Sequence, residues 1–432
     1  METLSYTQDG CTVFEYRMPV PLDWEDPNST PITLFAREIV RPGQEKAPRL
    51  LYLQGGPGGA ADRPDTIGGW IGAALNHYRM VLMDQRGTGA STPLDPAHLA
   101  AAGDVSAQTH YLKCLLERSI IRDAEALRQE LQGDAKWYTF GQSYGGFLTM
   151  CYLSFHPEGL LGSMITGGLE ATDGTLDDLY RSTYTKTIIR NGAYNDMYPQ
   201  DASMLRRVCA HLEDEEELLP TGEGLSARRF RTLGLGLGSS TRFRNLHYLL
   251  ESPFVSRNGQ SKLSQKFLGA LGHELSFASQ PLYACLHEPA YMSPGQASNW
   301  SANRVRAEFE GMEEDADPRD LDRAFHLSGE HIYPWLFDED PALRPYKDAA
   351  FGLAQDRDIP AHWDLDTLGD NQVPVAAAVY APDMYVPLEE SLRTASRIRR
   401  LVPWVSEKYH HNGIRVAGAL IFESLNGIMR GA

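Results

Sequence analysis

A serine in a glycine-flanked turn is the feature of this 432-residue chain that most directly suggests covalent chemistry. The pentapeptide Gly141-Gln-Ser-Tyr-Gly145 follows an apolar run, 137–140, and precedes a helical pattern, 144–155. A sharp turn between a strand and a helix holds the serine in a strained conformation and projects its hydroxyl from the sheet, at the positive end of the helix. Side chains at 141 and 145 would collide there, so glycine suits both positions. The pattern predicts that Ser143 is a nucleophile, the alternative being a glycine-rich turn with an incidental serine.

A serine hydroxyl is a weak nucleophile and needs a base that a third group orients. In this architecture the acid and then the histidine follow the serine along the chain, at the carboxyl ends of later strands. The convincing late strand is 375–380, and Asp383 comes directly after it. Beyond Asp383 the only histidines are His410 and His411. We therefore expect Asp383 as the acid and one of these two histidines as the base, the alternative for either being an exposed loop histidine.

A glycine-rich segment supplies candidates for stabilising an oxyanion. An apolar strand, 51–53, is followed by Gln54-Gly-Gly-Pro-Gly-Gly59. Backbone N–H groups there, that of Gly56 among them, are expected to face the developing negative charge together with the N–H of Tyr144. A phosphate-binding loop is the alternative, but no Lys-Ser/Thr pair follows and Pro57 removes a donor.

The elements expected around these residues alternate between strands and helices. Apolar and β-branched runs predict strands within 11–54 and at 79–83, 137–140 and 160–166, and helical spacing predicts helices at 120–131 and 144–155. From Ala171 the sequence has helical and polar patches. A strand-like pattern returns at 373–380, and a helical stretch follows at 417–429. An acid run, 213–217, is interpreted as a solvated helix face, not a metal site. We predict a mostly parallel sheet formed by 1–170 and 366–432, interrupted by a helical insertion, 171–365.

Composition excludes several classes of function. The chain has 40 basic and 57 acidic residues, for a net charge of −17, which argues against a nucleic-acid partner and an anionic membrane surface. Its five cysteines show no metal-ligand spacing and suit a reducing compartment. No signal-peptide pattern and no run of about 18 apolar residues is present, so we expect a cytoplasmic protein.

Three segments together resemble a known family. QGGPGG at 54–59, DQRGTGAS at 84–91 and GQSYGG at 141–146 are similar to the signatures of proline iminopeptidases (prolyl aminopeptidases), which are S33-type α/β-hydrolase serine peptidases. The resemblance covers 12–170 and 370–432 best. The chain length and a PVPLDW segment at 19–24 resemble the larger, actinobacterial-type subgroup. The resemblance implies an α/β-hydrolase fold, with the helical insertion as a cap that selects the substrate.

By position in these motifs, the resemblance implies that Ser143 is the nucleophile and Asp383 the acid. Larger members carry a His-Asn/Asp-Gly-Leu-Arg pattern before the last helix, and HNGIR at 411–415 is similar. We therefore prefer His411 to His410 as the base. The family needs no metal and no organic cofactor, and none is expected here.

Family members bind the free amino group of the substrate with cap carboxylates. LHEPAY at 286–291 and SGEHIYPW at 328–335 resemble cap motifs, which makes Glu288 and Glu330 candidates. A carboxylate in a closed pocket binds a terminal ammonium strongly. Tyr333 and Trp335 are expected to wall a site for the proline ring. Ordinary helix-surface charges are the alternative for both glutamates.

The sequence therefore predicts a serine exopeptidase that releases N-terminal proline, or a small N-terminal residue, from small peptides with a free N-terminus. A broader aminopeptidase or an esterase on the same three residues is the rival enzyme. A catalytically silent binding protein with a hydrolase fold is a third interpretation, which the intact serine, aspartate and histidine disfavour. No feature of the sequence indicates an oligomeric state.

Overall fold

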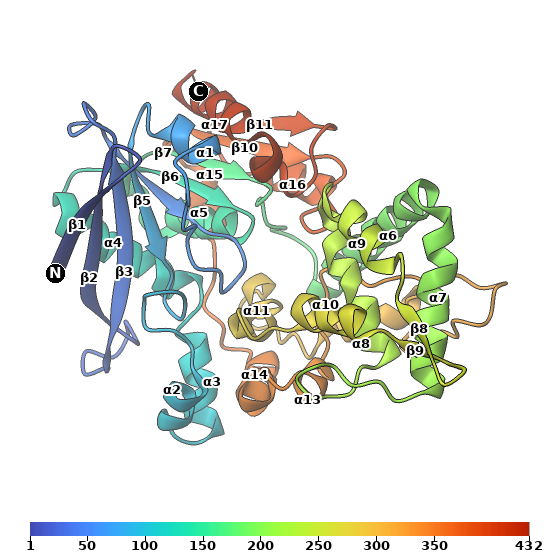
Figure 1. Ribbon diagram of the computed structural model, residues 1–432. Coiled ribbons are helices and arrows are strands. Elements are labelled where there is room, and N and C mark those ends of the chain that lie inside the picture. Colours follow the sequence, from blue (N-terminus) through green and yellow to red (C-terminus); the bar gives the residue numbers. More distant parts are fainter. Residues whose placement is uncertain (432) are drawn as a thin grey trace.

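The computed structural model describes residues 1–431, and a nine-stranded sheet forms its centre (Figure 1). One edge of the sheet is built from the three N-terminal strands, β1 (Glu2–Gln8), β2 (Cys11–Pro21) and β3 (Pro31–Val40). These strands run antiparallel to one another, and β3 pairs antiparallel with β5.

The remaining six strands are parallel. Their spatial order is β5 (Arg79–Asp84), β4 (Arg49–Leu53), β6 (Trp137–Gln142), β7 (Leu160–Thr166), β10 (Val375–Tyr380) and β11 (Leu401–Ser406). Since parallel strands share a direction, their carboxyl ends meet along one edge of the sheet, where α/β proteins place ligands.

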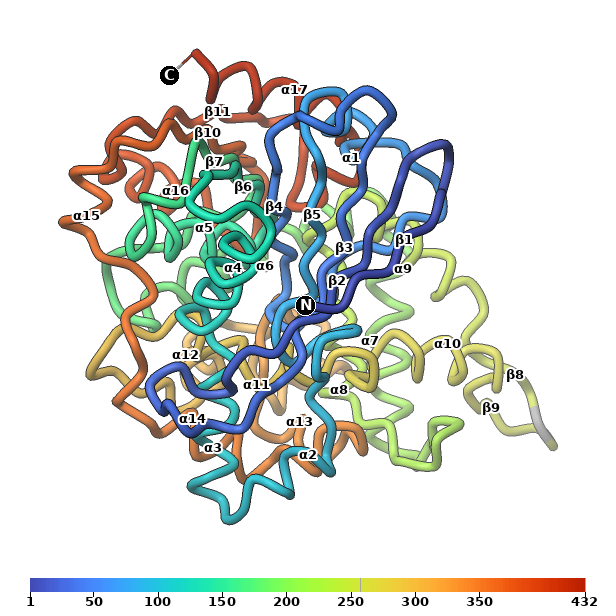
Figure 2. The backbone as a smooth tube through the Cα atoms, turned by 90° about the vertical axis from the view of Figure 1, so that its left-hand side faces the viewer, coloured from blue at the N-terminus to red at the C-terminus, as the bar shows by residue number. Residues whose placement is uncertain are grey.

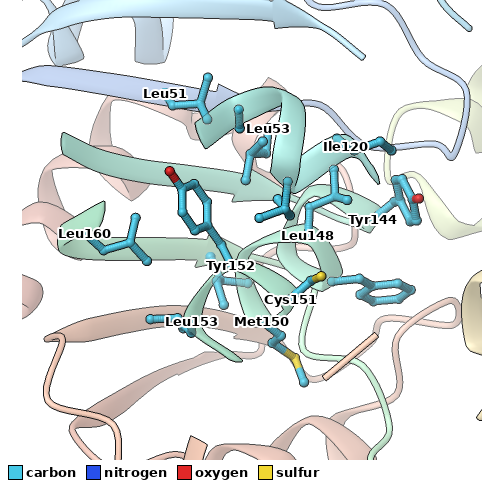
Figure 3. Close-up of a cluster of buried hydrophobic side chains, with 14 of the residues drawn as sticks. Leu51, Leu53, Ile120, Tyr144, Leu148, Met150, Cys151, Tyr152, Leu153 and Leu160 are labelled. Atoms are coloured by element: carbon cyan, nitrogen blue, oxygen red, sulfur yellow. The ribbon is translucent and has the colours of Figure 1, made fainter. Parts of the chain in front are cut away.

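Successive residues of the central strands face opposite sides of the sheet, and both sides are covered by helices. Leu51 and Leu53 belong to a buried cluster with α4, α5, α15 and α16, part of which Figure 3 shows. Leu50 and Tyr52 belong to a second cluster with α1 and α17. The helices concerned are α1 (Gly69–Ala74), α4 (Glu117–Gln132), α5 (Tyr144–Phe155), α15 (Leu365–Gly369), α16 (Leu388–Ala395) and α17 (Gly413–Gly431).

Between β7 and β10 the chain forms a mainly helical cap that lies beyond one end of the sheet (Figures 1 and 2). Its helices are α6 (Leu176–Met197), α7 (Pro199–Asp214), α8 (Ala227–Arg231), α9 (Arg242–Leu250), α10 (Gln265–Leu275), α11 (Pro281–Leu286), α12 (Ser301–Val305), α13 (Leu336–Glu339) and α14 (Lys347–Gln355). It also contains a hairpin, β8 (Phe254–Arg257) and β9 (Gln260–Leu263), and the 3₁₀ turns η2 (Thr232–Gly238), η3 (Pro289–Tyr291), η4 (Arg306–Glu308) and η5 (Arg344–Tyr346).

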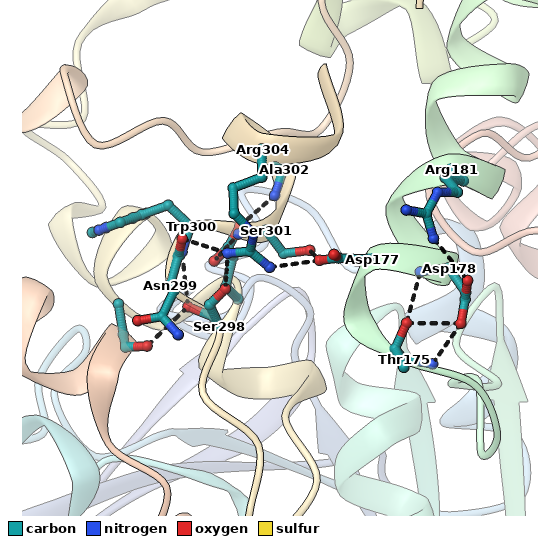
Figure 4. A network of polar contacts seen from close by, with 12 residues as sticks. Thr175, Asp177, Asp178, Arg181, Ser298, Asn299, Trp300, Ser301, Ala302 and Arg304 are labelled. Atoms are coloured by element: carbon teal, nitrogen blue, oxygen red, sulfur yellow. Dashed lines mark hydrogen bonds and ion pairs between the residues drawn. The ribbon is translucent and has the colours of Figure 1, made fainter. Parts of the chain in front are cut away.

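Polar contacts determine where the cap begins (Figure 4). Thr175 and Asp178 form a reciprocal capping box at the start of α6, which satisfies backbone N–H groups of its first turn. Asp177 in the same turn accepts hydrogen bonds from Ser301 Oγ and, at 2.6 Å, from Arg304. These contacts connect α6 to α12, which lies more than a hundred residues further along the chain.

The expected strands at 79–83 and 160–166 and the helix at 144–155 are confirmed. Strands β1 and β11 were not predicted, because both are edge strands with mostly exposed side chains and carry no buried pattern.

The interpretation of the acid run as one helix face is wrong, because α7 ends at Asp214. The Glu217 carboxylate instead accepts a hydrogen bond from the Leu263 N–H, 3.0 Å away, and lies 2.7 Å from His211.

Two short helices from the N-terminal part of the chain pack with the cap. Helices α2 (Pro96–Ala101) and α3 (Val105–Lys113) contribute Leu99 and Leu112 to a buried cluster that otherwise consists largely of cap residues. The Lys113 ammonium also lies 3.2 Å from the carboxylate of Asp356, the residue that follows α14. The apolar core of the cap therefore includes residues from before 170, while the division at 170/171 and 365/366 stays a prediction.

A buried group of one histidine and two carboxylates joins the end of the cap to the core. His362 precedes α15, Glu117 begins α4 and Glu170 follows β7, and each is at most 3% exposed. His362 Nδ1 lies 3.0 Å from Glu117 Oε2. Burial alone would lower the pKa of His362, but Glu117 and Glu170 raise it to about 9. Burial raises the pKa of Glu170 to about 8, against the opposing effect of His362.

Titration of this buried group predicts that the protein loses stability as the pH rises. Both pKa values are raised above their ordinary values of 6.5 and 4.5, so the stabilising contribution is complete below those values and is lost as the pH rises through 8 and 9. Tyr144 and Cys151 of α5 and Tyr291 also face it, and burial raises their pKa values so that they stay uncharged there. We expect the Tm, measured by differential scanning fluorimetry, to fall between pH 6.5 and 9.

His362→Gln and Glu170→Gln should each reduce that fall, because each removes one of the titrating groups. His98→Gln changes an exposed histidine on α2 and should keep the wild-type dependence. Identical dependence of Tm on pH in all four proteins would contradict the assignment.

Candidate active site

Ser143 occupies the turn between β6 and α5 with φ 54° and ψ −124°, a strained conformation for a residue with a side chain. A Cβ added at Gly145 would lie 1.9 Å from the Leu53 carbonyl oxygen, and one added at Gly141 would lie 2.0 Å from the Gly145 carbonyl oxygen. The predicted collision at 141 and 145 is therefore confirmed. The close crossing places the Ser143 hydroxyl at the carboxyl edge of the sheet and at the N-terminus of α5.

The structure brings Ser143, His411 and Asp383 together in one hydrogen-bonded chain. His411 Nε2 lies 2.9 Å from Ser143 Oγ, and His411 Nδ1 lies 2.7 Å from Asp383 Oδ2. Asp383 follows β10 and His411 precedes α17, so both come from loops at the same edge of the sheet as the serine turn. This geometry allows His411 to take the serine proton while Asp383 holds the ring.

Asp383 is fully buried, and its two oxygens have separate partners. Oδ1 accepts hydrogen bonds from the N–H groups of Tyr385 at 2.9 Å and Val386 at 3.2 Å, which leaves Oδ2 for His411. Burial alone would lower the pKa of His411, but the charge and hydrogen bond of Asp383, with a smaller effect of Glu330, raise it above 6.5. The aspartate therefore both orients the imidazole and makes it a stronger base.

The neighbouring His410 has different surroundings. Burial and the charge of Arg190 lower the pKa of His410, and among the described residues its Nδ1 has no hydrogen-bond partner. Adjacent residues in a loop point in different directions, and only His411 contacts Ser143 and Asp383. The geometry therefore favours His411 as the base.

The glycine-rich segment that carries Gly56 packs directly over the nucleophile. A Cβ added at Gly55 would lie 3.1 Å from the Ser143 Cβ. Tyr144 is the first residue of α5, so its N–H belongs to the unpaired first turn of that helix. The segment and the helix start therefore flank the serine, as an oxyanion site requires, and the roles of Gly56 and Tyr144 stay predictions.

Hydrogen bonds from the segment 84–91 hold the glycine-rich loop in place. Asp84 accepts hydrogen bonds from the N–H groups of Ala61 at 3.0 Å and Ala90 at 2.8 Å and pairs with Arg63. Gln85 Nε2 donates to the Gln54 carbonyl oxygen at 2.8 Å. Sequence reasoning used this segment only as a family signature and missed its structural role, because the burial of Asp84, Gln85 and Arg86 is visible only in the folded protein.

A cavity of about 450 Å³ is lined by residues of the cap and by Tyr385, which follows β10 near His411. Tyr385 lines it, and the Tyr385 ring centroid lies 4.7 Å from that of His411 in an edge-on arrangement. Tyr283 of α11 lines it as well, next to the position where the loop at Gly58 touches α11. Neither tyrosine was predicted as a site residue, because only tertiary packing brings them to the histidine.

Glu330 lies beside this cavity. Its carboxylate accepts a hydrogen bond from the Tyr283 hydroxyl at 2.5 Å, and His287 Nε2 lies 3.8 Å away. Burial alone would raise the pKa of Glu330, but His287, His411 and the Tyr283 hydroxyl together lower it below its ordinary value. Glu330 is therefore a buried carboxylate that stays charged close to His411.

Glu288 has a different environment. Its carboxylate accepts hydrogen bonds from the N–H groups of Ser301 at 3.1 Å and Ala302 at 2.9 Å, at the start of α12. Burial raises the pKa of Glu288, and these backbone contacts only partly oppose that rise. The geometry favours a role in stabilising α12, and it favours Glu330 over Glu288 as a ligand for an amine.

Tyr333 and Trp335 lie within the apolar core of the cap and are absent from the lining of the 450 Å³ cavity. Their rings stack with centroids 5.3 Å apart, and the Tyr333 hydroxyl lies 3.1 Å from that of Tyr184. Their role as walls for a proline ring stays a prediction.

One group of potential metal ligands occurs among the described residues. His110 Nε2 lies 2.9 Å from Asp23 Oδ2 and 3.5 Å from Cys114 Sγ. Metal binding by cysteine requires the thiolate, and burial raises the pKa of Cys114 to about 12. The hydrogen bond between Asp23 and His110 accounts for the contact without a metal.

The sheet order, the strained serine turn and the Ser143–His411–Asp383 chain define the class of protein as an α/β hydrolase, and the family model for the alpha/beta hydrolase fold matches residues 48–218. A proline iminopeptidase of Aeromonas sobria is 40% identical over 98% of this chain and 97% of that protein. Another from Aspergillus aculeatus is 30% identical over 97% of this chain and 95% of that one. The chain belongs to the proline iminopeptidase family, as its motifs implied.

A solved structure of a proline iminopeptidase from Mycobacterium smegmatis matches over 96% of this chain and 99% of that one, with a TM-score of 0.45 and 13% identity. The family assignment depends on the two sequence relatives, not on this distant likeness. Within residues 1–431, no helix is both long and apolar enough to cross a membrane.

The close crossing at the serine turn predicts that Gly145→Ala is strongly destabilising. The new Cβ would force apart the backbones of α5 and β4, and overpacking of this kind costs roughly 1–3 kcal/mol or more. Gly192→Ala, on an exposed face of α6 with nothing within 4 Å, should be neutral or stabilising by about 0.5–1 kcal/mol. Urea denaturation measures both free energies of unfolding, and equal values for the two variants would refute the steric argument.

Proposed function

We propose that this protein is a serine aminopeptidase that releases N-terminal proline from small peptides. The observation that carries the proposal is the Ser143–His411–Asp383 chain at a cavity beside a buried, charged carboxylate, Glu330, in a chain of the proline iminopeptidase family. The first part of that arrangement cleaves an acyl bond, and the second selects a substrate with a free amine. The segment 171–365 acts in this proposal as the substrate-selecting cap.

In the proposed first step, Ser143 Oγ attacks the carbonyl carbon of the N-terminal residue, and its proton moves to His411 Nε2. The carbonyl oxygen becomes an oxyanion that accepts hydrogen bonds from the N–H groups of Gly56 and Tyr144. The C–N bond then breaks, and His411 returns the proton to the leaving amine. The product is an ester of the N-terminal residue with Ser143.

In the second step a water molecule attacks that ester, with its proton again passing to His411. The C–O bond to Ser143 breaks, Oγ regains a proton from His411, and the free amino acid leaves. Asp383 stays charged throughout and stabilises the imidazolium in both steps. No step requires a metal or an organic cofactor.

Glu330 selects the substrate in this proposal by pairing with the terminal ammonium. Glu330 is a largely buried carboxylate that its surroundings keep charged, so a cation that reaches it gains a strong, charge-assisted interaction. An acetylated N-terminus carries no charge and would leave Glu330 unpaired. The rival functions, a broader aminopeptidase or an esterase, use the same three residues and differ only in what the cavity selects.

A cytoplasmic location is also proposed. All five cysteines are buried free thiols, which suits a reducing compartment.

Removal of the nucleophile or the base should abolish peptidase activity. Ser143→Ala and His411→Ala should each lower kcat/KM for prolyl-β-naphthylamide by on the order of 10⁶, and Ser143→Ala should leave the Tm unchanged, while Asp383→Asn should cost about 10⁴. His410→Ala is the matched control and should change kcat/KM little, because His410 contacts neither Ser143 nor Asp383. Ser143→Ala retaining a tenth of the activity, or loss only in His410→Ala, would overturn the assignment.

Glu330→Gln should lower kcat/KM for prolyl-β-naphthylamide by about ten- to a hundred-and-fifty-fold, because a charge-assisted contact contributes roughly 1.5–3 kcal/mol. Hydrolysis of p-nitrophenyl acetate, which has no amine, should barely change.

Glu288→Gln is the comparison, and it should lower the Tm through α12 and reduce activity on the amide and the ester alike. If Glu330→Gln also affected both substrates equally, the proposed amine site would be wrong.

A further inference from the structure

The cavity beside the catalytic residues carries opposite charges at two different places. Glu330 lies beside its wall, where Tyr283, Gly329 and His331 line the cavity. Arg242, the first residue of α9, lines the same cavity together with Glu274, and it is the only lysine or arginine among the described residues that line it. A short peptide with free ends has the complementary pattern, an ammonium at one end and a carboxylate at the other.

A chain of contacts connects Arg242 to the reacting groups. Tyr385 packs edge-on against His411, and its hydroxyl donates a hydrogen bond to the Leu235 carbonyl oxygen of η2. A Cβ added at the next residue, Gly236, would lie 3.5 Å from Arg242 Nε. Arg242 therefore lies on the cavity wall just beyond the tyrosine that covers the catalytic histidine.

The present partner of Arg242 is one that a ligand can displace or join. The guanidinium pairs with Glu274 of α10 at 2.5 Å, and the two side chains are 43% and 34% exposed. Exposed ion pairs of this kind contribute little to stability, so the pair costs little to rearrange. Arginine presents its N–H donors in a fork that matches a carboxylate.

We infer that Arg242 binds the C-terminal carboxylate of short peptide substrates, so that the cavity recognises both ends of a peptide of a few residues. This inference rests on the proposed peptidase function and extends it to the length and terminal chemistry of the substrate. A volume of about 450 Å³ lies in the lower part of the range of small-molecule sites, which suits such a peptide better than a long chain.

The test compares Pro-Gly-Gly with Pro-Gly-Gly-amide, which differ only in the terminal carboxylate. We expect the wild-type kcat/KM to favour the free acid by about five- to tenfold, as for a partly exposed charge-assisted contact. Arg242→Gln should bring this ratio close to one, and Arg242→Lys should restore part of it. Glu274→Gln should raise the ratio, because it removes the competing carboxylate.

Lys266→Gln is the matched control, because Lys266 lines a neighbouring hollow of about 340 Å³ and not this cavity. It should keep the wild-type ratio. A ratio near one in the wild type, an unchanged ratio in Arg242→Gln, or an equal loss in Lys266→Gln would overturn the inference.

If the wild type cleaved neither peptide, the proposed function would fail separately, and binding would still decide the inference. Calorimetry with Ser143→Ala should then show tighter binding of Pro-Gly-Gly than of its amide, and equal dissociation constants would overturn it.

Discussion

The active site depends on one steric constraint, the crossing of backbones at the serine turn. The start of α5 runs so close to the end of β4 that a methyl group at Gly145 would overlap the Leu53 carbonyl oxygen. A Cβ at Gly146 would likewise lie 2.2 Å from the Gly168 carbonyl oxygen, just after β7. The ends of two strands and the start of one helix therefore meet without intervening side chains. This contact forces Ser143 into its strained conformation and directs its hydroxyl toward the loops that follow β10 and β11.

The electrostatics of the site follow from how each buried charge is compensated. Asp383 has two backbone N–H donors on one oxygen and His411 on the other, so both oxygens are engaged and the carboxylate orients His411. Glu288 has two backbone donors at a helix start, which only partly oppose the effect of its burial. Glu330 has a tyrosine hydroxyl, a histidine at 3.8 Å and the nearby His411, which together keep it charged beside the cavity. The two glutamates therefore differ in their local donors and in the direction of their pKa shifts.

The cap and the core are joined by buried polar contacts as well as by apolar packing. His362 and Glu117 pair in the interior at the place where the chain returns from the cap. Lys113, at the end of α3, pairs with the carboxylate of Asp356, which follows α14. These contacts connect segments that are far apart in sequence, so the position of the cap over the serine depends on them. A cavity built between two such bodies can change its selectivity without altering the catalytic residues.

Much of the core and the nucleophile could be predicted from the sequence, because their signals are local. The strand, glycine-flanked turn and helix around Ser143 occupy one short segment, and Asp383 follows a strand with a continuous apolar run. Motif resemblance added the preference for His411. Edge strands such as β1 and β11 escaped prediction, because their exposed side chains carry no burial pattern.

Tertiary structure alone decided the rest of the site. His410 and His411 are neighbours of the same residue type, and the packing of their loop determines which one faces Ser143. Glu288 and Glu330 are both glutamates in short cap motifs, yet one meets the N–H groups of a helix start and the other a tyrosine hydroxyl near His411. The direction of a side chain and its partners from distant segments are not encoded in local spacing. They arise only when the cap and the sheet pack together.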